Sequence, residues 1–301
     1  MMLRQDSLIK GQVLPMLGAR PRKALESMEQ EGLLLAEEIR LRPGHSLLVQ
    51  GGGREVWLPL TVNVEDLLET MNILSQYSYY AFAEQLARGY ITVAGGHRIG
   101  VAGRVTVQKG RVAALAETGS INIRIARQVK GAGKTALPWL FSRGQLLNTL
   151  ILAACYRGIP QLDEAGLTVG VADERSELAG CYRGIPQLDV GRRTDVLDGC
   201  PRDQGLEMLV RSMGPQVVAA DEIGRRADAR ALENVLAAGV AVLTTAHARD
   251  LAEARQRPVL RGLLAEGYFQ RAVILGRREG RPEIAGVAEL PGGKLIYRGE
   301  M

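Results

Sequence analysis

The sequence predicts an α/β fold in which a mostly parallel sheet carries helices on both faces and follows a smaller α+β domain. The second half of the chain contains four short, nearly continuous apolar runs that end in polar residues. They are LLNTLILAA (146–154), GLTVGVADE (166–174), PQVVAADE (215–222) and GVAVLTTAH (239–247). Between the last two, RRADARALENVLAAG has apolar residues at helical spacing. Such runs are typical of strands buried on both faces, and their alternation with helices indicates a parallel sheet.

The start of the chain predicts helices followed by a hairpin. Residues 1–40 are predicted to be helical, with breaks at proline and glycine. Residues 37–60 alternate apolar and polar side chains around turn glycines, which is the pattern of a β-hairpin. The overlap of the two ranges leaves open where the helical part ends.

Two further helices and a run of strands complete the first half. Asn63 is expected to cap a helix over residues 64–74, and Ser78 a helix over residues 79–88 that stops at Gly89. Residues 90–129 predict three or four short strands joined by glycine turns. In this region His97, Arg98 and Arg104 could contact phosphate or acidic lipid, but a hairpin whose glycines serve the turns is the favoured interpretation.

Length and charge support two domains, which the sequence places at residues 1–143 and 144–301. Residues 1–145 carry 18 basic and 12 acidic residues, a net of +6, whereas the rest carries 20 and 21, a net of −1. An anionic partner is therefore expected at the first half. Only 13 aromatic residues are available for base stacking, so nucleic-acid binding is a weak alternative and no DNA partner is expected.

Composition also bounds the location of the protein. Three cysteines do not form a disulfide framework or a zinc motif, which favours a reducing cytoplasm. The N-terminus lacks the apolar stretch of a signal peptide, and no apolar run approaches the roughly 18 residues of a membrane span. We therefore expect a cytoplasmic protein, with any membrane association peripheral.

The strongest functional signal is an acid pair after a predicted strand. In PQVVAADEIG, four apolar or small residues lead into Asp221 and Glu222. ATPases present acids in this way, one to a magnesium ion and one to the attacking water. A pair of acids that merely caps the next helix is the alternative. Because the strands before Glu174 and His247 also end in polar groups, and parallel strands place such groups at one sheet edge, we favour a site.

Other polar residues are expected around this edge. Thr244, Thr245 and His247 could sense a phosphate through hydroxyl and imidazole groups, or they could simply pack at a strand end. Four arginines are candidates for binding phosphate or for completing the site of a neighbouring subunit, as arginines do in phosphoryl transfer. They are Arg175, Arg192, Arg193 and Arg211. Any one of them could equally be a solvated surface residue.

The residues resemble one family in particular. ITVAGGHRIGVAGRV, SINIRIAR, VADERSELAGCYRGIPQLDVGRRTDVLDGCP, RSMGPQVVAADEIG and TTAH are similar, in order, to the stage III sporulation protein AA family of endospore-forming bacteria. That family is a secretion-type P-loop ATPase related to the AAA+ proteins and to type II and type IV secretion motors. The resemblance implies ATP and Mg²⁺ as cofactors and a homo-oligomeric ring. It also implies membrane-protein partners in the channel between mother cell and forespore, with the protein at the mother-cell face.

The resemblance also assigns roles to residues of this chain. Asp221 and Glu222 match the family's Walker B positions, with Asp221 holding magnesium through water. Glu174 and Arg175 match its second-strand acid and arginine, and His247 its strand-end histidine. Either Glu222 or Glu174 would orient the attacking water.

One part of the family pattern is missing. A Walker A loop, GxxxxGK[ST], should follow the strand NTLIL, but no such motif is present and the chain has no lysine between Ala136 and Gly293. In its place, CYRGIPQLD at residues 155–163 repeats letter for letter at residues 181–189. A phosphate loop needs backbone N–H groups, a helix N-terminus and a lysine. We therefore expect ATP to bind poorly or not at all, which leaves a nucleotide-free scaffold or ring subunit as the alternative function.

A second lysine-containing segment could be mistaken for the missing loop. KGAGKTALPW includes Lys134 and Thr135, but the first glycine of the motif would have to be residue 128, which is Gln128. Pro138 also limits the helix that should follow. A basic linker between the domains is the better interpretation.

Overall fold

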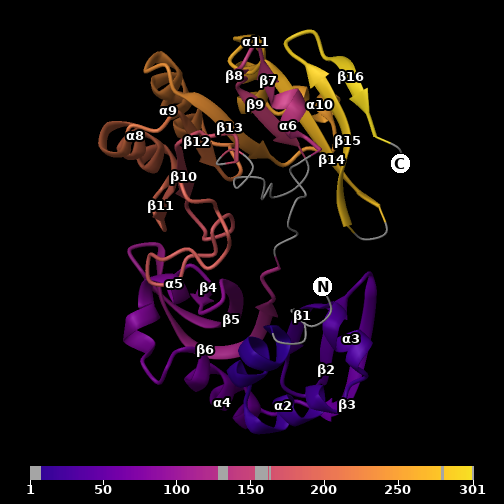
Figure 1. Ribbon diagram of the computed structural model, residues 1–301. Helices are drawn as coiled ribbons and strands as arrows, with labels where there is room; N and C mark the ends of the chain where they lie inside the picture. Colours follow the sequence, from indigo (N-terminus) through magenta and orange to yellow (C-terminus); the bar gives the residue numbers. More distant parts are fainter. Residues whose placement is uncertain (1–7, 128–134, 153–161, 163, 279–280, 300–301) are drawn as a thin grey trace. The chain divides into compact units, whose positions relative to one another are not determined.

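The chain divides into two units, residues 1–127 and 128–301. The computed structural model describes residues 8–127, 135–152, 162, 164–278 and 281–299 (Figure 1). The division lies upstream of the boundary expected between residues 143 and 144. The reason is that the short helix α6 (Leu137–Leu140) packs in the core of the second unit. Leu140 on this helix and Ala136 just before it are both fully buried there.

Unit 1 is an antiparallel six-stranded sheet with helices on one face, in the order β3-β2-β1-β6-β5-β4. Its strands are β1 (Ala36–Leu41), β2 (Ser46–Gly51), β3 (Arg54–Thr61), β4 (Tyr90–Val93), β5 (His97–Gln108) and β6 (Arg111–Arg124). Its helical segments are η1 (Ile9–Val13), η2 (Leu14–Met16), α2 (Ala19–Glu26), α3 (Gln30–Leu35), α4 (Val64–Leu74), η3 (Tyr79–Phe82) and α5 (Ala83–Ala87). Alternate strand residues such as Ile39, Ile99 and Ile123 join these helices in one core. The helical part of the N-terminus thus ends at Leu35.

The expected cap of α4 is present. The side chain of Asn63 accepts from the N–H of Asp66 at 2.8 Å, and the carboxylate of Asp66 accepts from the N–H of Asn63 at 2.9 Å. The prediction for Ser78 is wrong, because α5 begins after Phe82 and has no side-chain cap. The residues between Ser78 and α5 form the short 3₁₀ helix η3 instead. Gly89 does end α5, with a φ of 84°.

The described part of residues 90–129 forms three strands, within the predicted number, but two of them are longer than predicted. β5 and β6 pair over most of their length, because Gly103 and Gly119 lie within the paired strands, at a shift of register, and not in turns. A Cβ at Gly103 would lie 1.9 Å from the carbonyl oxygen of Glu117, so only glycine fits there. His97 is buried. Its Nδ1 accepts from the N–H of Ala126 at 3.0 Å, and burial lowers its pKa to about 4. The hairpin interpretation of this region is therefore confirmed for His97.

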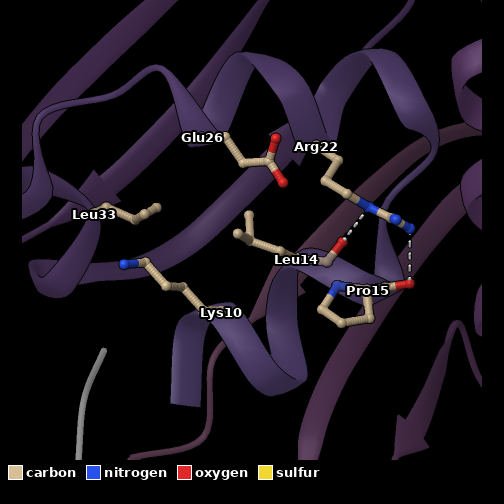
Figure 2. A pocket seen from close by; sticks show the side chains of 6 residues that line it. All are labelled: Lys10, Leu14, Pro15, Arg22, Glu26 and Leu33. Carbon is tan, nitrogen blue, oxygen red and sulfur yellow. Dashed lines mark hydrogen bonds between the residues drawn. The ribbon is translucent and has the colours of Figure 1, made fainter. Parts of the chain in front are cut away.

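Unit 1 also has a cavity of about 400 Å³ beside α2 (Figure 2). It is lined by Lys10, Leu14, Pro15, Arg22, Glu26 and Leu33. The guanidinium of Arg22 donates to the carbonyls of Leu14 (3.0 Å), Pro15 (3.3 Å) and Leu17 (2.9 Å). These carbonyls belong to η2 and the residue after it, and that of Leu14 also accepts from the N–H of Leu17 at 3.2 Å, so Arg22 adds donors at the end of the short helix.

Unit 2 contains an eight-stranded sheet in the order β11-β10-β12-β13-β9-β14-β15-β16. The first six strands in this order run parallel to one another, β15 pairs antiparallel with β14, and β16 pairs antiparallel with β15. The strands are β9 (Thr149–Leu152), β10 (Val169–Asp173), β11 (Thr194–Asp198), β12 (Val217–Ala220), β13 (Ala241–Ala246), β14 (Arg271–Arg278), β15 (Arg281–Glu289) and β16 (Lys294–Arg298). Two short strands, β7 (Phe141–Ser142) and β8 (Gln145–Leu146), form a separate hairpin. The predicted α/β class and the four predicted parallel strands are confirmed.

The two faces of this sheet are covered differently. Helices α8 (Arg202–Met213), α9 (Arg226–Ala237), α10 (Leu251–Gln256) and α11 (Pro258–Ala265) pack on the face that carries Leu150, Val218 and Val242 (Figure 1). The opposite face carries Ile151, Val217 and Leu243 and is covered by α6, Leu162 and parts of the segment 178–190. Within the described residues, no helix is long and apolar enough to cross a membrane.

Candidate functional site

Acidic residues gather where the parallel strands of unit 2 end. Asp173, the last residue of β10, pairs in register with Asp198, the last residue of β11. On the other side, Ala172 pairs with Ala220, so Asp221 continues β12 beside Asp173. All three side chains lie at the carboxyl edge of the sheet, which is where open α/β sheets bind ligands.

A buried arginine holds this edge together. Arg202 is the first residue of α8 and is 4% exposed. Its Nε donates to Oδ1 of Asp221 at 2.9 Å, its Nη1 donates to Oδ2 of Asp228 at 3.2 Å, and its Nη2 lies 3.3 Å from Oε2 of Glu174. A cation at a helix N-terminus opposes the helix dipole. The three carboxylates that surround the guanidinium of Arg202 compensate for this unfavourable position at the start of α8.

Asp228 belongs to the same network and is held in place by backbone hydrogen bonds. It is fully buried in the first turn of α9, where its Oδ2 accepts from the N–H groups of Gly224 (3.1 Å) and Arg225 (2.9 Å). The side chain of Arg225 then bridges Asp228 (3.3 Å) and Glu174 (2.8 Å). Glu174 is therefore shared between Arg202 and Arg225 and is not free to act alone.

Glu222 has a different environment from its neighbour Asp221. Its side chain is 40% exposed, and its Oε2 lies 3.5 Å from Nε2 of His247 and 3.9 Å from Nη1 of Arg175. Its backbone N–H donates to the hydroxyl of Thr245 at 2.8 Å, which fixes the start of the side chain. An exposed carboxylate flanked by an imidazole and a guanidinium can accept a proton from water and also has hydrogen-bond donors beside it for a phosphate.

The buried carboxyls at this edge hold protons more tightly than ordinary acids. Burial raises the pKa of Asp173 to about 7. The negative charges of Asp221 and Asp198 raise this pKa further, while the hydrogen bond from the N–H group of Ala179 lowers it. The same carboxyl accepts from the N–H groups of Glu177 (2.8 Å), Leu178 (3.0 Å) and Ala179 (2.8 Å). Burial also raises the pKa of Asp221, while Arg202 opposes this rise.

The pKa of Asp173 has a consequence for stability. Between about pH 4 and 7 the folded state holds this proton and the unfolded state does not. The contribution of Asp173 to the free energy of unfolding therefore falls as pH rises through that window. We expect Asp173→Asn to remove that decline, as measured by urea unfolding at pH 4.5, 6 and 7.5. Asp189→Asn, an exposed carboxylate in the loop that follows Ala179, should leave the decline unchanged. An unchanged pH profile in Asp173→Asn would contradict the assignment.

The two threonines of the predicted cluster lie in different surroundings. Thr245 accepts from Glu222 and so supports the acid directly. Thr244 is 1% exposed, and its hydroxyl has no hydrogen-bond partner among the described residues. Of the TTAH segment, Thr245 and His247 are thus the residues that reach Glu222.

The predicted arginines separate into two groups. Arg175 lies at the carboxyl edge beside Glu222. Arg192 and Arg193 directly precede β11, and Arg211 lies in the last turn of α8, where it pairs with Glu207 at 3.3 Å. Because β11 ends at the carboxyl edge, the residues before it lie at the opposite edge of the sheet. Arg192 and Arg193 therefore do not join the site of their own chain.

The missing-loop predictions fall partly outside the described residues. Lys134 and the first repeat, except Leu162, lie outside them, and Thr135 is an exposed turn residue before α6. The second repeat is described. Cys181 in it is buried, and Tyr182 and Ile185 form a tight turn closed by N–H···O bonds of 3.0 and 3.1 Å. The second copy is therefore folded and packs against the face of the sheet that carries Ile151, Val217 and Leu243.

Sequence reasoning missed Arg202, Arg225 and Asp228. Asp228 had a readable signal, since an acid three residues into a helix is part of a capping box. Arg202 had a weaker one: a cation immediately after Pro201, at the start of a helix, is unfavourable unless acids are near.

The donor groups decide which parts of the site fit Mg²⁺ and ATP. Asp221 is 2% exposed and already binds Arg202, so its carboxylate as found does not fit a hydrated magnesium ion. Among the described residues, no set of three His, Cys, Asp or Glu side chains is arranged to hold a metal ion. Arg175 and His247 are suited to a phosphate group. The lysine of a phosphate loop is absent from the sequence between Ala136 and Gly293.

Solved structures share this fold. The chain is similar to the Legionella pneumophila ATPase DotB, with a TM-score of 0.52 and 16% identity over 90% of this chain and 80% of that chain. It is also similar to the pilus retraction motor PilT with bound ADP, with a TM-score of 0.52 and 14% identity over 90% of this chain and 82% of that one. At these identities the similarity shows the fold alone.

The sequence comparisons show the family. A model of the family described as "Sporulation stage III, protein AA" matches residues 8–295. The chain is 38% identical over 287 residues to stage III sporulation protein AA of Bacillus subtilis (strain 168), covering 91% of this chain and 93% of that protein. These matches place the chain in the sporulation stage III protein AA family.

Proposed function

We propose that this protein is the ATPase-type subunit of the stage III sporulation channel, with a hydrolytic edge but only weak nucleotide binding. The observation that carries the proposal is the arrangement around Glu222. A half-exposed carboxylate lies between His247 and Arg175, beyond the carboxyl ends of a parallel sheet. The family and the secretion-ATPase fold support the same conclusion. As a ring at the mother-cell face, it would act with membrane proteins of the channel.

The residues at the carboxyl edge have different roles in the proposed hydrolysis. Glu222 accepts a proton from the attacking water, and Arg175 and His247 orient the phosphate end of the substrate. Asp221 holds Arg202 in place, and Arg202 positions Glu174 at the same edge. When bound, ATP would supply the phosphoanhydride bond that water cleaves. Arg192 and Arg193, at the far edge of the sheet, are the candidates to act on a neighbouring subunit.

A non-hydrolysing ring subunit is the second candidate function. The observation that favours it is the sequence between Ala136 and Gly293, which has no lysine and no GxxxxGK[ST] motif. Without a lysine and a glycine-rich loop, the charge of a triphosphate is not balanced where the strand β9 ends.

Nucleotide binding separates the two candidates. Titration of the unaltered chain with a fluorescent ATP analogue is expected to show no binding at micromolar concentrations. A chain in which a GxxxxGKT loop and its helix replace residues 153–165 should bind at least about 100-fold more tightly, since the loop restores several N–H donors and one cation. Micromolar binding to the unaltered chain that Asp221→Ala abolishes would contradict the proposal of weak binding. A grafted chain that keeps its Trp139 emission but binds no ATP would favour the non-hydrolysing subunit.

A further inference from the structure

The solvent face of the sheet in unit 1 has a small polar pocket. It has a volume of about 250 Å³ and is lined by Arg40, Arg42, Gly89, Gly100, Val101, Ala102, Ser120, Ile121 and Asn122. Three adjacent strands, β1, β6 and β5, contribute to it, with Asn122 paired to Arg40 on one side and to Gly100 on the other. Glycine at position 100 leaves the space open.

One side of the pocket is fixed by an ion-paired network. The carboxylate of Glu38 accepts from Nε (3.1 Å) and Nη2 (2.6 Å) of Arg40, and its other oxygen lies 3.2 Å from Nε of Arg124. Burial acts to raise the pKa of Glu38, but its arginine and asparagine partners bring the pKa below the ordinary value. Glu38 is therefore ionised and neutralises one of its two arginine partners.

Asn122 presents an unsatisfied acceptor. Its amide nitrogen donates to Oε2 of Glu38 at 3.2 Å, so the amide cannot turn over without placing its oxygen against a carboxylate. Its Oδ1 is buried and has no hydrogen-bond partner among the described residues. Because that oxygen is closed to solvent, Asn122 forms part of the pocket wall, held in place by Glu38.

Arg42 supplies the charge that is not neutralised. Among the described residues, no side chain forms a hydrogen bond or an ion pair with its guanidinium, which lines the same pocket. Together with Arg40, Arg124 and Glu38, the pocket and its immediate neighbours carry three positive charges and one negative charge. An anion is the complement of that balance.

We infer that this pocket binds a phosphate monoester or inorganic phosphate. Phosphate oxygens accept from the guanidinium of Arg42 and the hydroxyl of Ser120, both of which line the pocket. The site lies wholly within unit 1 and uses no residue of the edge around Glu222.

The direct test measures binding of inorganic phosphate to the full chain by calorimetry, at constant ionic strength so that general screening does not change. Arg42→Ala should weaken binding about tenfold or more, because it removes charge-assisted hydrogen bonds. Arg111→Ala removes the same charge from an exposed strand end and should have no effect. Gly100→Val should block the pocket. A Cβ there meets only Asn122, at 3.8 Å, so the strand tolerates a side chain.

Three results would overturn the inference: no phosphate binding by the unaltered chain, binding that Arg42→Ala leaves unchanged, or binding that Glu222→Gln abolishes. Vesicles of phosphatidylcholine with and without phosphatidic acid identify the source of the phosphate. Sedimentation with phosphatidic acid that needs Arg42 supports a lipid headgroup. Phosphate binding without sedimentation supports a soluble phosphate monoester.

Discussion

Glu222→Gln is expected to lower the rate of ATP hydrolysis by about 10²–10⁴ in a chain that carries the grafted phosphate loop. The amide keeps the size of the side chain and its position beside His247 and Arg175, but it cannot accept a proton from water. Binding of ATP should change little, because the carboxylate is assigned to the water and not to the phosphates. Release of inorganic phosphate under saturating ATP measures the effect.

The matched control for this prediction is Glu207→Gln. Glu207 is a glutamate of the same unit that pairs with Arg211 on the exposed side of α8, away from the carboxyl edge. Its replacement should leave the rate within about twofold, as for a surface change. If Glu222→Gln and Glu207→Gln had equal rates, Glu222 would not be the residue that activates water.

Arg202→Met is expected to destabilise unit 2 by about 3–5 kcal/mol. Methionine fills similar space but leaves the buried Asp221 without a cation and the buried Asp228 with Arg225 alone. The cost arises mainly from Asp221, whose desolvated carboxylate must then take up a proton or stay unpaired. Urea unfolding followed by Trp139 emission measures it. In a Trp57→Phe background, Trp139 is the only tryptophan of the sequence and it belongs to unit 2.

Arg211→Met provides the comparison on the same helix. The ion pair of Arg211 with Glu207 is 3.3 Å long, but the arginine side chain is 78% exposed, so its loss should cost under about 1 kcal/mol. The double variant Arg202→Met with Asp221→Asn should recover part of the loss, since it removes the carboxylate that is left without a cation. A loss below about 1 kcal/mol in Arg202→Met would show that the network does not stabilise the edge.

The sequence predicted four strands that are buried on both faces, but it missed β14 and β15, which also contribute to both cores through Ala272, Val273, Val287 and Ala288. β9, β10, β12 and β13 are continuous apolar runs because both sides of each strand meet a core. β11 lies at the edge of the sheet with no fully buried residue, so it lacks such a run. Gly103 was predicted in a turn, but it lies in a register shift between β5 and β6, where a glycine serves close backbone contact.

The candidate site was predictable to the extent that strand ends define it. Asp221, Glu222, Glu174 and His247 follow buried strands, so parallel topology brings them to one edge. Arg202 could not be predicted in the same way. Its three partners come from the ends of β10 and β12 and from the start of α9, and only tertiary packing brings these segments around one guanidinium.

The most direct test compares phosphate release from ATP by the unaltered chain and by the chain with the grafted loop. The central claim is that the edge around Glu222 is arranged for hydrolysis while the means of holding a triphosphate is missing. The predicted result is release by the grafted chain that depends on Glu222, and none above background by the unaltered chain. Equal, Glu222-dependent release by both chains would contradict the claim.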